Sequence, residues 1–405
     1  MVPICVCSGG GACVYMDMKT VTNTNSEKLF MGALPEGFLF GAGVSGHQVE
    51  GDNVHSDWWY AEQQGKLPVS GVAADFYNRY ETDFALAQDM GLDVFRIAIE
   101  WSRIEPEEGR LDMESVEHYR RMLQNMKRHG LVRMVTLQHF TLPQWVAAKG
   151  GWENPRIAEW LGNYAKVVAE LLGSEVDIFF TINEPEVVLL MSYVRGLHPP
   201  FKKNVLLVPR VLRNILASHR SMYEQVKKCL PSAQVGIVKN NVFYEPYYSN
   251  LLDRAVVRAL SYIGNEYILE KILDHLDIIG LNYYFFDSVS VRGRTTKKAC
   301  KNDMGWRTYP KGLYYLLKQI GKYKKPIYIT ENGIANARDD MRQRFIAEHV
   351  HWALQARAEG VDVRGYVYWS FLDTYEWHNG YGLKFGLVEV NFETQERRCR
   401  HVFTS

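Results

Sequence analysis

Two glutamates in the sequence share a local setting that suits a pair of catalytic carboxylates. Glu331 follows the apolar run 327–330 in "PIYITENG", and Glu184 follows the run "DIFFTIN" at 177–183. One Glu after a strand is usually a cap or a solvated loop charge, but two such Glu are harder to explain that way. Glycoside hydrolysis needs two carboxyl groups that flank a sugar. One group stays protonated and donates to the leaving oxygen, while the other is ionised and attacks the anomeric carbon.

Further polar and aromatic side chains lie in or directly after other strand-like runs. They are Gln48, Arg96, His139, Asn183, Asn282, Tyr284, Trp369, Glu376 and Trp377. Arg96 stands inside the apolar run "VFRIAI", and a buried guanidinium needs a partner such as a carboxylate at a neighbouring strand end. His139 alone is more often a satisfied core histidine, and Asn183 alone could serve a turn. Their gathering at strand ends, rather than any one residue, indicates a site.

The runs that carry these residues alternate with longer amphipathic segments. Eight runs are predicted to be strands: 38–44, 94–99, 131–137, 177–183, 234–240, 276–284, 326–330 and 363–370. Strands that alternate with helices pair in parallel through crossovers. Eight such units favour an α/β fold with a single (β/α)8 TIM barrel, in which chemistry collects at the C-terminal strand ends. Glu184 and Glu331 would then stand at the ends of strands 4 and 7, where they can face one another across a sugar.

Composition and charge exclude several other classes of protein. The chain has 405 residues, and its 47 Lys and Arg against 46 Asp and Glu give a net charge of +1. That balance indicates no concentrated basic face, so no nucleic-acid partner is expected. No run of 18 apolar residues is present, so no transmembrane segment is expected. Six Cys without Cys-x-x-Cys pairs or a signal peptide favour a reducing, cytoplasmic location.

The chain divides into a leader and one domain. Residues 1–34 lack hydrophobic periodicity and are predicted to be a disordered N-terminal extension. Three Cys of this extension, at positions 5, 7 and 13, have a spacing that is only a weak indication of metal binding. No linker interrupts the chain after it, so residues 35–405 are predicted to form one (β/α)8 domain.

Six motifs in this chain resemble those of a known family. They are "FLFGAGVSGHQVEG", "FRIAIEWSRIEP", "TINEPE", "IGLNYY", "YITENG" and "YWSFLDTYEW". From about Leu34 to Arg400 the chain is similar to glycoside hydrolase family 1, the retaining β-glycosidases, and most of all to its compact archaeal members. The resemblance implies a β-glucosidase-type exo-enzyme that hydrolyses small β-D-glucosides, with β-galactosides as a further class, through a covalent glycosyl-enzyme. It implies no cofactor and no metal.

The same resemblance implies a role for each site residue. Glu331, at the end of strand 7, would be the nucleophile, and Glu184, at the end of strand 4, the acid/base. The residues that orient the nucleophile and hold it ionised would be Arg96, Asn282 and Tyr284. The residues that bind sugar hydroxyls would be Asn183, at the 2-hydroxyl, and Gln48, His139, Glu376 and Trp377. The aromatic residues around the sugar ring would be Trp369, beneath it, and Phe385, which closes over it.

Departures from the family pattern leave alternatives open. The stretch between the fifth and sixth strands is short, and the chain ends at "RRCRHVFTS", where members continue into a final helix. A truncated C-terminal helix would leave apolar surface that a loop or a second subunit could cover, so a homo-oligomer is one expectation. A catalytically impaired sugar-binding barrel and a mainly transglycosylating enzyme are the alternative functions. Gln48 and Glu376 can bind O4 of either glucose or galactose, so both glycones stay open.

Overall fold

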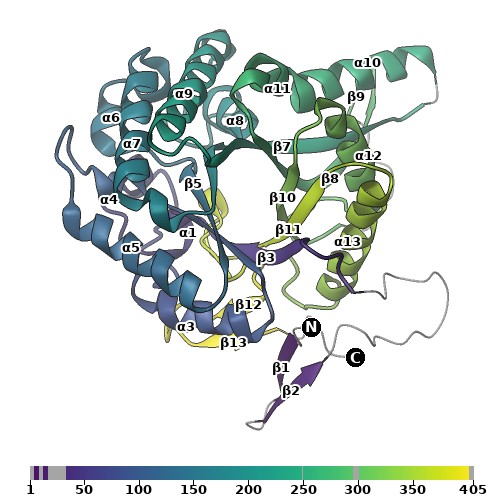
Figure 1. The fold of residues 1–405 in the computed structure, drawn as a ribbon. Coiled ribbons are helices and arrows are strands. Elements are labelled where there is room, and N and C mark those ends of the chain that lie inside the picture. The colour runs from purple at the N-terminus through teal and green to yellow at the C-terminus, as the bar shows by residue number, and fades with distance from the viewer. Residues whose placement is uncertain (1–3, 9–11, 17–32, 249, 295–300, 401–405) are drawn as a thin grey trace.

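A closed barrel of parallel strands with helices around it makes up the body of the protein (Figure 1). The computed structural model describes residues 4–8, 12–16, 33–248, 250–294 and 301–400. Within them, the barrel strands are β3 (Leu39–Gly43), β4 (Val94–Ala98), β5 (Val132–Gln138), β6 (Ile178–Asn183), β7 (Gln234–Pro246), β8 (Ile278–Ser290), β10 (Ile327–Asn332) and β11 (Val363–Trp369). Each pairs in parallel with the next, and β11 pairs with β3 to close the ring. The predicted (β/α)8 TIM barrel is confirmed.

Two strands run further than the sequence predicts. β7 and β8 continue past the barrel rim to Pro246 and Ser290, where they still pair with one another, as in Phe243 with Phe286. The short strand β9 (Gly293–Arg294) then pairs antiparallel with β8. The predicted ends at 240 and 284 lie close to where the strands leave the barrel, because β6 pairs with β7 only as far as Val238 and β10 pairs with β8 only as far as Asn282, while the β7–β8 ladder continues.

Helices connect the strands and cover the outside of the barrel. They are α1 (Gly46–Val49), α2 (Asp57–Gln63), α3 (Phe76–Asp89), α4 (Trp101–Ile104), α5 (Met113–Arg128), α6 (Gln144–Ala148), α7 (Ile157–Leu172), α8 (Pro185–Val187), α9 (Val208–Cys229), α10 (Leu251–Ser261), α11 (Tyr267–Ile272), α12 (Pro310–Ile320) and α13 (Arg342–Ala358). In α5, Val116, Tyr119, Leu123 and Met126 form the buried stripe. Asp112 caps this helix by accepting from the backbone N–H groups of its first turn.

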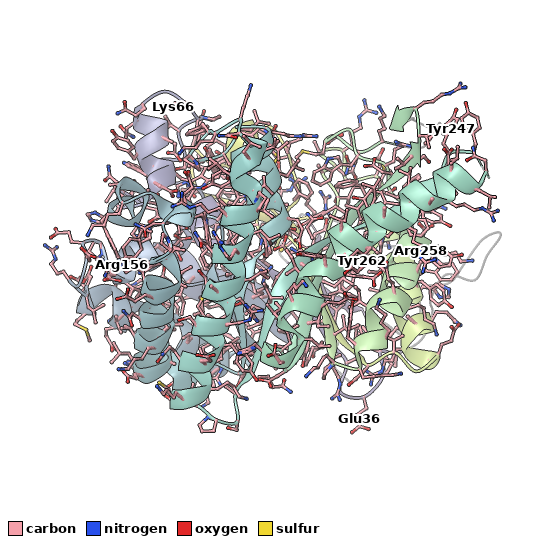
Figure 2. All side chains as sticks on the ribbon, turned by 90° about the horizontal axis from the view of Figure 1, so that it is seen from above. Glu36, Lys66, Arg156, Tyr247, Arg258 and Tyr262 are labelled. Atoms are coloured by element: carbon pink, nitrogen blue, oxygen red, sulfur yellow. The ribbon has the colours of Figure 1, made fainter. Side chains whose placement is uncertain are left out.

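Two apolar layers hold the barrel together. The inner layer fills the barrel lumen and consists of Val94, Met134, Ile178, Phe180, Val238, Ile278, Tyr328 and Val367. The outer layer lies between the strands and the helices. Full burial of each large aliphatic or aromatic side chain contributes about 1.5–3 kcal/mol. The lumen beneath the barrel mouth is therefore packed with apolar side chains. Figure 2 shows the two ends of the barrel: Glu36, before β3, lies opposite Lys66 and Tyr247, which lie at the mouth.

The segments outside the barrel are small. Strands β1 (Ile4–Ser8) and β2 (Ala12–Met16) pair antiparallel and add no strand to the barrel. The rest of the predicted N-terminal extension, apart from residues 33 and 34, lies outside the described residues. Near the C-terminus, β12 (Val388–Val390) pairs with β13 (Arg397–Cys399). Arg397 joins this hairpin to α3 through an ion pair with Asp83 at 3.0 Å.

None of the described helices combines the length and the apolar character needed to span a bilayer. The predicted cytoplasmic location and the predicted homo-oligomer stay predictions.

Candidate active site

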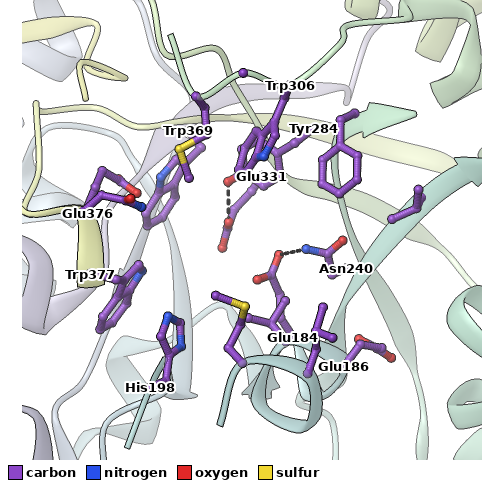
Figure 3. Close-up of a pocket in the computed structure, with 18 of the residues that line it drawn as sticks. Glu184, Glu186, His198, Asn240, Tyr284, Trp306, Glu331, Trp369, Glu376 and Trp377 are labelled. Atoms are coloured by element: carbon purple, nitrogen blue, oxygen red, sulfur yellow. Dashed lines mark hydrogen bonds between the residues drawn. The ribbon is translucent and has the colours of Figure 1, made fainter. Parts of the chain in front are cut away.

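A cavity of about 620 Å³ opens at the C-terminal ends of the barrel strands. The predicted site residues that line it are Gln48, His139, Glu184, Tyr284, Glu331, Trp369, Glu376, Trp377 and Phe385. The other three, Arg96, Asn183 and Asn282, are buried and hydrogen-bonded to these residues or to one another. In Figure 3 the carboxyl groups of Glu184 and Glu331 point toward one another across the cavity. All twelve predicted residues thus belong to one constellation.

Glu331 is held between a cation and a phenol. Arg96 Nη1 donates to Glu331 Oε1 at 2.5 Å, and both side chains are almost fully buried. Tyr284 Oη donates to Glu331 Oε2 at 2.6 Å. Burial, with the nearby charge of Glu331, raises the pKa of Tyr284 well above its usual value, so the phenol keeps its proton. Each carboxylate oxygen therefore has its own donor, which fixes the orientation of the group.

Arg96 uses the rest of its guanidinium to join neighbouring strand ends. Its Nε donates to Thr136 Oγ1 on β5 at 2.9 Å, and Nη2 donates to Asn183 Oδ1 on β6 at 2.7 Å. Nη1 also reaches the backbone oxygen of Thr330 on β10 at 3.3 Å. The partner that the sequence requires for a buried arginine is thus present, together with three further acceptors.

Glu184 stands in a different electrostatic setting. Its Oε1 accepts from Asn282 Nδ2 at 2.8 Å and from Asn240 Nδ2 at 3.0 Å, and no cation is bonded to it among the described residues. Burial raises the pKa of Glu184 to about 8, and the negative charge of Glu331 adds to the increase. Glu184 therefore carries a proton at neutral pH, which is what a general acid requires.

Asn282 has a different partner from the one the sequence predicts. The family resemblance assigns it to Glu331, whereas its amide donates to Glu184. Thr330 Oγ1 donates to Asn282 Oδ1 at 2.7 Å, so this oxygen is occupied and Nδ2 is turned toward Glu184. Asn282 and Glu331 are neighbours in the β8–β10 ladder, so Asn282 lies beside Glu331 although its amide donates to Glu184.

A second group of polar residues lies on the far wall of the cavity. Gln48 Nε2 donates to Glu376 Oε1 at 3.2 Å, and Thr374 Oγ1 donates to the same oxygen at 2.6 Å. Burial raises the pKa of Glu376 to about 7. Asn183 Nδ2 lies 3.1 Å from His139 Nε2. Burial lowers the pKa of His139 well below its usual value, so the imidazole is neutral.

Aromatic rings enclose the same space. His139 stacks with Trp369 at 5.7 Å between ring centroids and with Trp377 at 6.1 Å. On the other side, Phe385 packs in an apolar cluster with Tyr284, Trp369 and the partly buried Trp306. Flat ring faces beside hydrogen-bonding groups suit a sugar, which presents C–H faces and hydroxyl edges. Among the described residues, no group of three or more His, Cys, Asp or Glu side chains is placed to hold a metal ion.

The sequence reasoning missed several site residues, among them Asn240 and Trp306. Asn240, which bonds Glu184, is the last residue of the predicted strand 234–240, so the same strand-end signal could have found it. Trp306 lies in the motif "MGWRTYPKGL", within a loop, and no periodic pattern marks it.

The structure is a (β/α)8 barrel with two buried glutamates at its mouth, one bonded to a cation and a phenol and the other to neutral amides. This combination defines a glycoside-cleaving enzyme. The chain matches the model of glycosyl hydrolase family 1 over residues 30–275 and 266–404, and it belongs to this family. The predicted family and the predicted enzyme class, an O-glycosyl hydrolase of the β-glucosidase type, are confirmed at this level.

Several characterised proteins are similar to this chain over most of their length. The structure of a beta-glycosidase from Pyrococcus horikoshii has a TM-score of 0.87 and 37% identity, covering 91% of this chain and 92% of that chain. Beta-glucosidase A from Thermotoga maritima is 30% identical over 420 residues, covering 90% of this chain and 94% of the relative. A beta-galactosidase from Pyrococcus woesei is 29% identical over 480 residues, covering 90% and 94%.

Proposed function

We propose that this protein is a retaining exo-β-glycosidase that hydrolyses β-D-glucosides, and β-galactosides as a further class, by double displacement. The observation that carries the proposal is that the two facing carboxyl groups have different hydrogen-bond partners. Glu331 is bonded to Arg96 and Tyr284, whereas Glu184 is bonded only to neutral amides and has a raised pKa. This division supplies one ionised nucleophile and one proton donor.

In the first step, an oxygen of Glu331 attacks the anomeric carbon of the glycoside. The bond between that carbon and the aglycone oxygen breaks, and the proton of Glu184 moves to the departing oxygen. The aglycone leaves as an alcohol, and the sugar remains joined to Glu331 by an ester bond. The negative charge of Glu331, which Arg96 and Tyr284 stabilise, disappears as the ester forms and returns in the second step.

In the second step, Glu184 acts as a base. It takes a proton from a water molecule whose oxygen attacks the anomeric carbon, and the bond to Glu331 breaks. Glu184 is then protonated and Glu331 ionised again, so the cycle is closed. Two inversions at the same carbon give net retention.

The glycone would lie against Gln48, Trp369, Glu376 and Trp377. Trp369, Glu376 and Trp377 form one wall in Figure 3, opposite Asn240 and Glu186, where the leaving group would lie. Support for both glycones comes from the relatives, which include a beta-glucosidase and a beta-galactosidase. The enclosed aromatic wall supports removal of a terminal sugar, because a chain continuing past the glycone would meet Trp377 and Phe385.

Release of nitrophenol from an aryl β-glucoside tests the activity, and azide tests the roles of the two glutamates. Glu331→Ala should abolish turnover, and azide attacking the substrate directly should yield the α-glycosyl azide. Glu184→Ala should retain the covalent step with a dinitrophenyl leaving group, and azide should then yield the β-glycosyl azide. Glu389→Ala, at an exposed position on β12, is the matched control and should keep full activity.

The alternative functions give distinct results in the same assays. A folded wild type without turnover that still binds glucose would replace the proposal with a sugar-binding barrel. Sugar transfer exceeding hydrolysis at low acceptor concentration would identify a transglycosylating enzyme.

A further inference from the structure

A buried lysine lies directly behind the wall that carries Glu184. Lys239 on β7 has no exposed side-chain surface, and its Nζ forms an ion pair with Glu186 Oε1. The same Nζ donates to the backbone oxygen of Gly264 at 3.0 Å, in the π-helix η5 (Tyr262–Glu266). None of the chemistry described above uses this pair, although Glu186 lines the cavity only two residues after Glu184.

Neighbouring residues of β7 hold both glutamates. Successive side chains of a strand point to opposite faces, so Asn240 faces the cavity and Lys239 faces the helical layer. Asn240 donates to Glu184 Oε1 at 3.0 Å, and Lys239 pairs with Glu186. Figure 3 shows the hydrogen bond from Asn240 to Glu184, with Glu186 beyond it on the same side of the cavity. Side chains of β7 thus hold the turn after β6 from both sides, Asn240 from the cavity and Lys239 from the helical layer.

The turn that carries Glu184 needs such attachment. Glu184 has φ 46° and ψ 63°, in the left-handed region that a residue with a β-carbon seldom adopts. Its backbone N–H donates to Val238 O of β7 at 2.9 Å. Only Pro185 separates Glu184 from Glu186. The helix that follows, α8, has three residues and passes directly into the π-helix η3 (Val188–Val194), so regular helix provides little support.

The pair also has an electrostatic reason to stay intact. Burial lowers the pKa of Lys239 to about 7, so its charge at neutral pH depends on a nearby carboxylate. An ammonium group left buried without a partner would lose its proton or draw water into the layer. Because the carboxylate of Glu186 is the only acidic group bonded to Lys239 among the described residues, any shift of the turn away from β7 separates these charges.

We propose that Lys239 is a positioning residue for the acid/base: its ion pair with Glu186 fixes the turn after β6, so that the carboxyl group of Glu184 stays within reach of the leaving-group oxygen. The inference rests on the proposed role of Glu184. It assigns Lys239 no contact with the substrate, and it predicts a defect confined to steps in which Glu184 moves a proton.

The test compares leaving groups of different basicity. The dinitrophenolate group of dinitrophenyl β-glucoside leaves without protonation, whereas the phenolate group of phenyl β-glucoside needs the proton of Glu184 in order to leave. General acid catalysis contributes about 10²- to 10⁴-fold, so a displaced acid should lose part of it. For Lys239→Met, and for Glu186→Gln, we expect kcat/KM to fall about 10- to 100-fold with phenyl β-glucoside. The same variants should stay within about threefold of the wild type with dinitrophenyl β-glucoside. Lys239→Arg retains the positive charge and should restore much of the loss.

The controls separate positioning from folding. Thermal unfolding of each variant, and labelling of Glu331 by a 2-fluoro dinitrophenyl glycoside, report on the fold and on the nucleophile. Equal losses with both leaving groups, or an unchanged dependence on the leaving group, would overturn the positioning role. A different result would contradict the proposed function itself: Glu184→Ala would lose no more activity with phenyl β-glucoside than with dinitrophenyl β-glucoside.

Discussion

Arg96 and Glu331 form a buried ion pair of 2.5 Å although they are 235 positions apart in the chain. They come from β4 and β10, which are not neighbours in the barrel, so the bond crosses the barrel mouth rather than following one ladder. Through Thr136 and Asn183 the same guanidinium also reaches β5 and β6. The acceptors of one side chain therefore set the relative positions of the strand ends on which the proposed chemistry depends.

Replacing Arg96 should damage stability as well as activity. In Arg96→Met the carboxylate of Glu331 remains buried without its cation, and breaking a buried pair costs about 3–5 kcal/mol. Urea unfolding should show this decrease in the free energy of unfolding. Arg364→Met removes an exposed pair with Asp362, with half of each side chain accessible, and should cost about 0–1 kcal/mol. Equal effects of the two substitutions would contradict the structural role of Arg96.

The hydroxyl of Tyr284 should matter to rate more than to folding. Tyr284→Phe removes the 2.6 Å hydrogen bond to Glu331 Oε2 but keeps the ring in its aromatic cluster. A hydrogen bond to a charged group is worth about 1.5–3 kcal/mol, so kcat should fall about 10- to 100-fold if that bond orients the attacking carboxylate. Steady-state kinetics measure the decrease. A change in KM alone would show that the hydroxyl serves binding instead.

The dependence of activity on pH should report on Glu184. With its pKa raised to about 8, kcat/KM should decrease above that pH as the acid loses its proton. The amides of Asn282 and Asn240 favour the ionised form, so Asn282→Ala should raise the pKa and move the basic limb to higher pH. Asn240→Ala should act in the same direction. Movement of the acidic limb in Asn282→Ala would instead place its influence on Glu331.

Stability should depend on pH through the same group. The pKa of Glu184 is about 8 in the folded chain against an ordinary value of 4.5, so the folded state binds this proton more tightly. Its contribution to stability is fully present below about pH 4.5 and is lost as the pH rises through about 8. Unfolding of the wild type and of Glu184→Gln, followed across this range, should show the wild type losing stability relative to the variant. A constant difference would contradict the raised pKa.

Glu376 should influence the glycone more than the leaving group. Its carboxyl group accepts from Gln48 and Thr374 on the cavity wall proposed to bind the glycone. Glu376→Gln should lower kcat/KM about 10- to 100-fold for glucosides and galactosides, if two charge-assisted hydrogen bonds to the sugar are weakened. The loss should be the same for phenyl and dinitrophenyl glycosides. A loss limited to one glycone would show which of the two the wall prefers.

Much of the fold could be predicted because it follows from local pattern. Each predicted strand run coincides with an observed strand to within a few residues, apart from the extensions of β7 and β8. The strand-end rule also gathered side chains that are distant in sequence, such as Glu184 and Glu331, at one mouth. The position of a residue at a strand end does not determine which neighbour it bonds. Asn282 lies near both glutamates, and a hydrogen bond from Thr330 to its amide oxygen turns its amide nitrogen toward Glu184. The proposed role of Lys239 could not be predicted for a related reason, because it depends on the ion pair with Glu186 and on the conformation of the turn after β6.

The extensions of β7 and β8 beyond the rim separate two tasks that share one cavity. Val242 and Tyr244, two residues apart on β7, line the cavity on the side of the proposed leaving group, as does Phe286 on β8. Beyond the barrel this pair of strands is a ribbon supported by its own ladder, whereas the bond-breaking groups are supported by the barrel. Mutations in the ribbon can therefore change which aglycone is accepted without moving Glu184 or Glu331. This separation makes the ribbon a region in which natural selection, or a combinatorial library, can vary specificity while the proposed chemistry is retained.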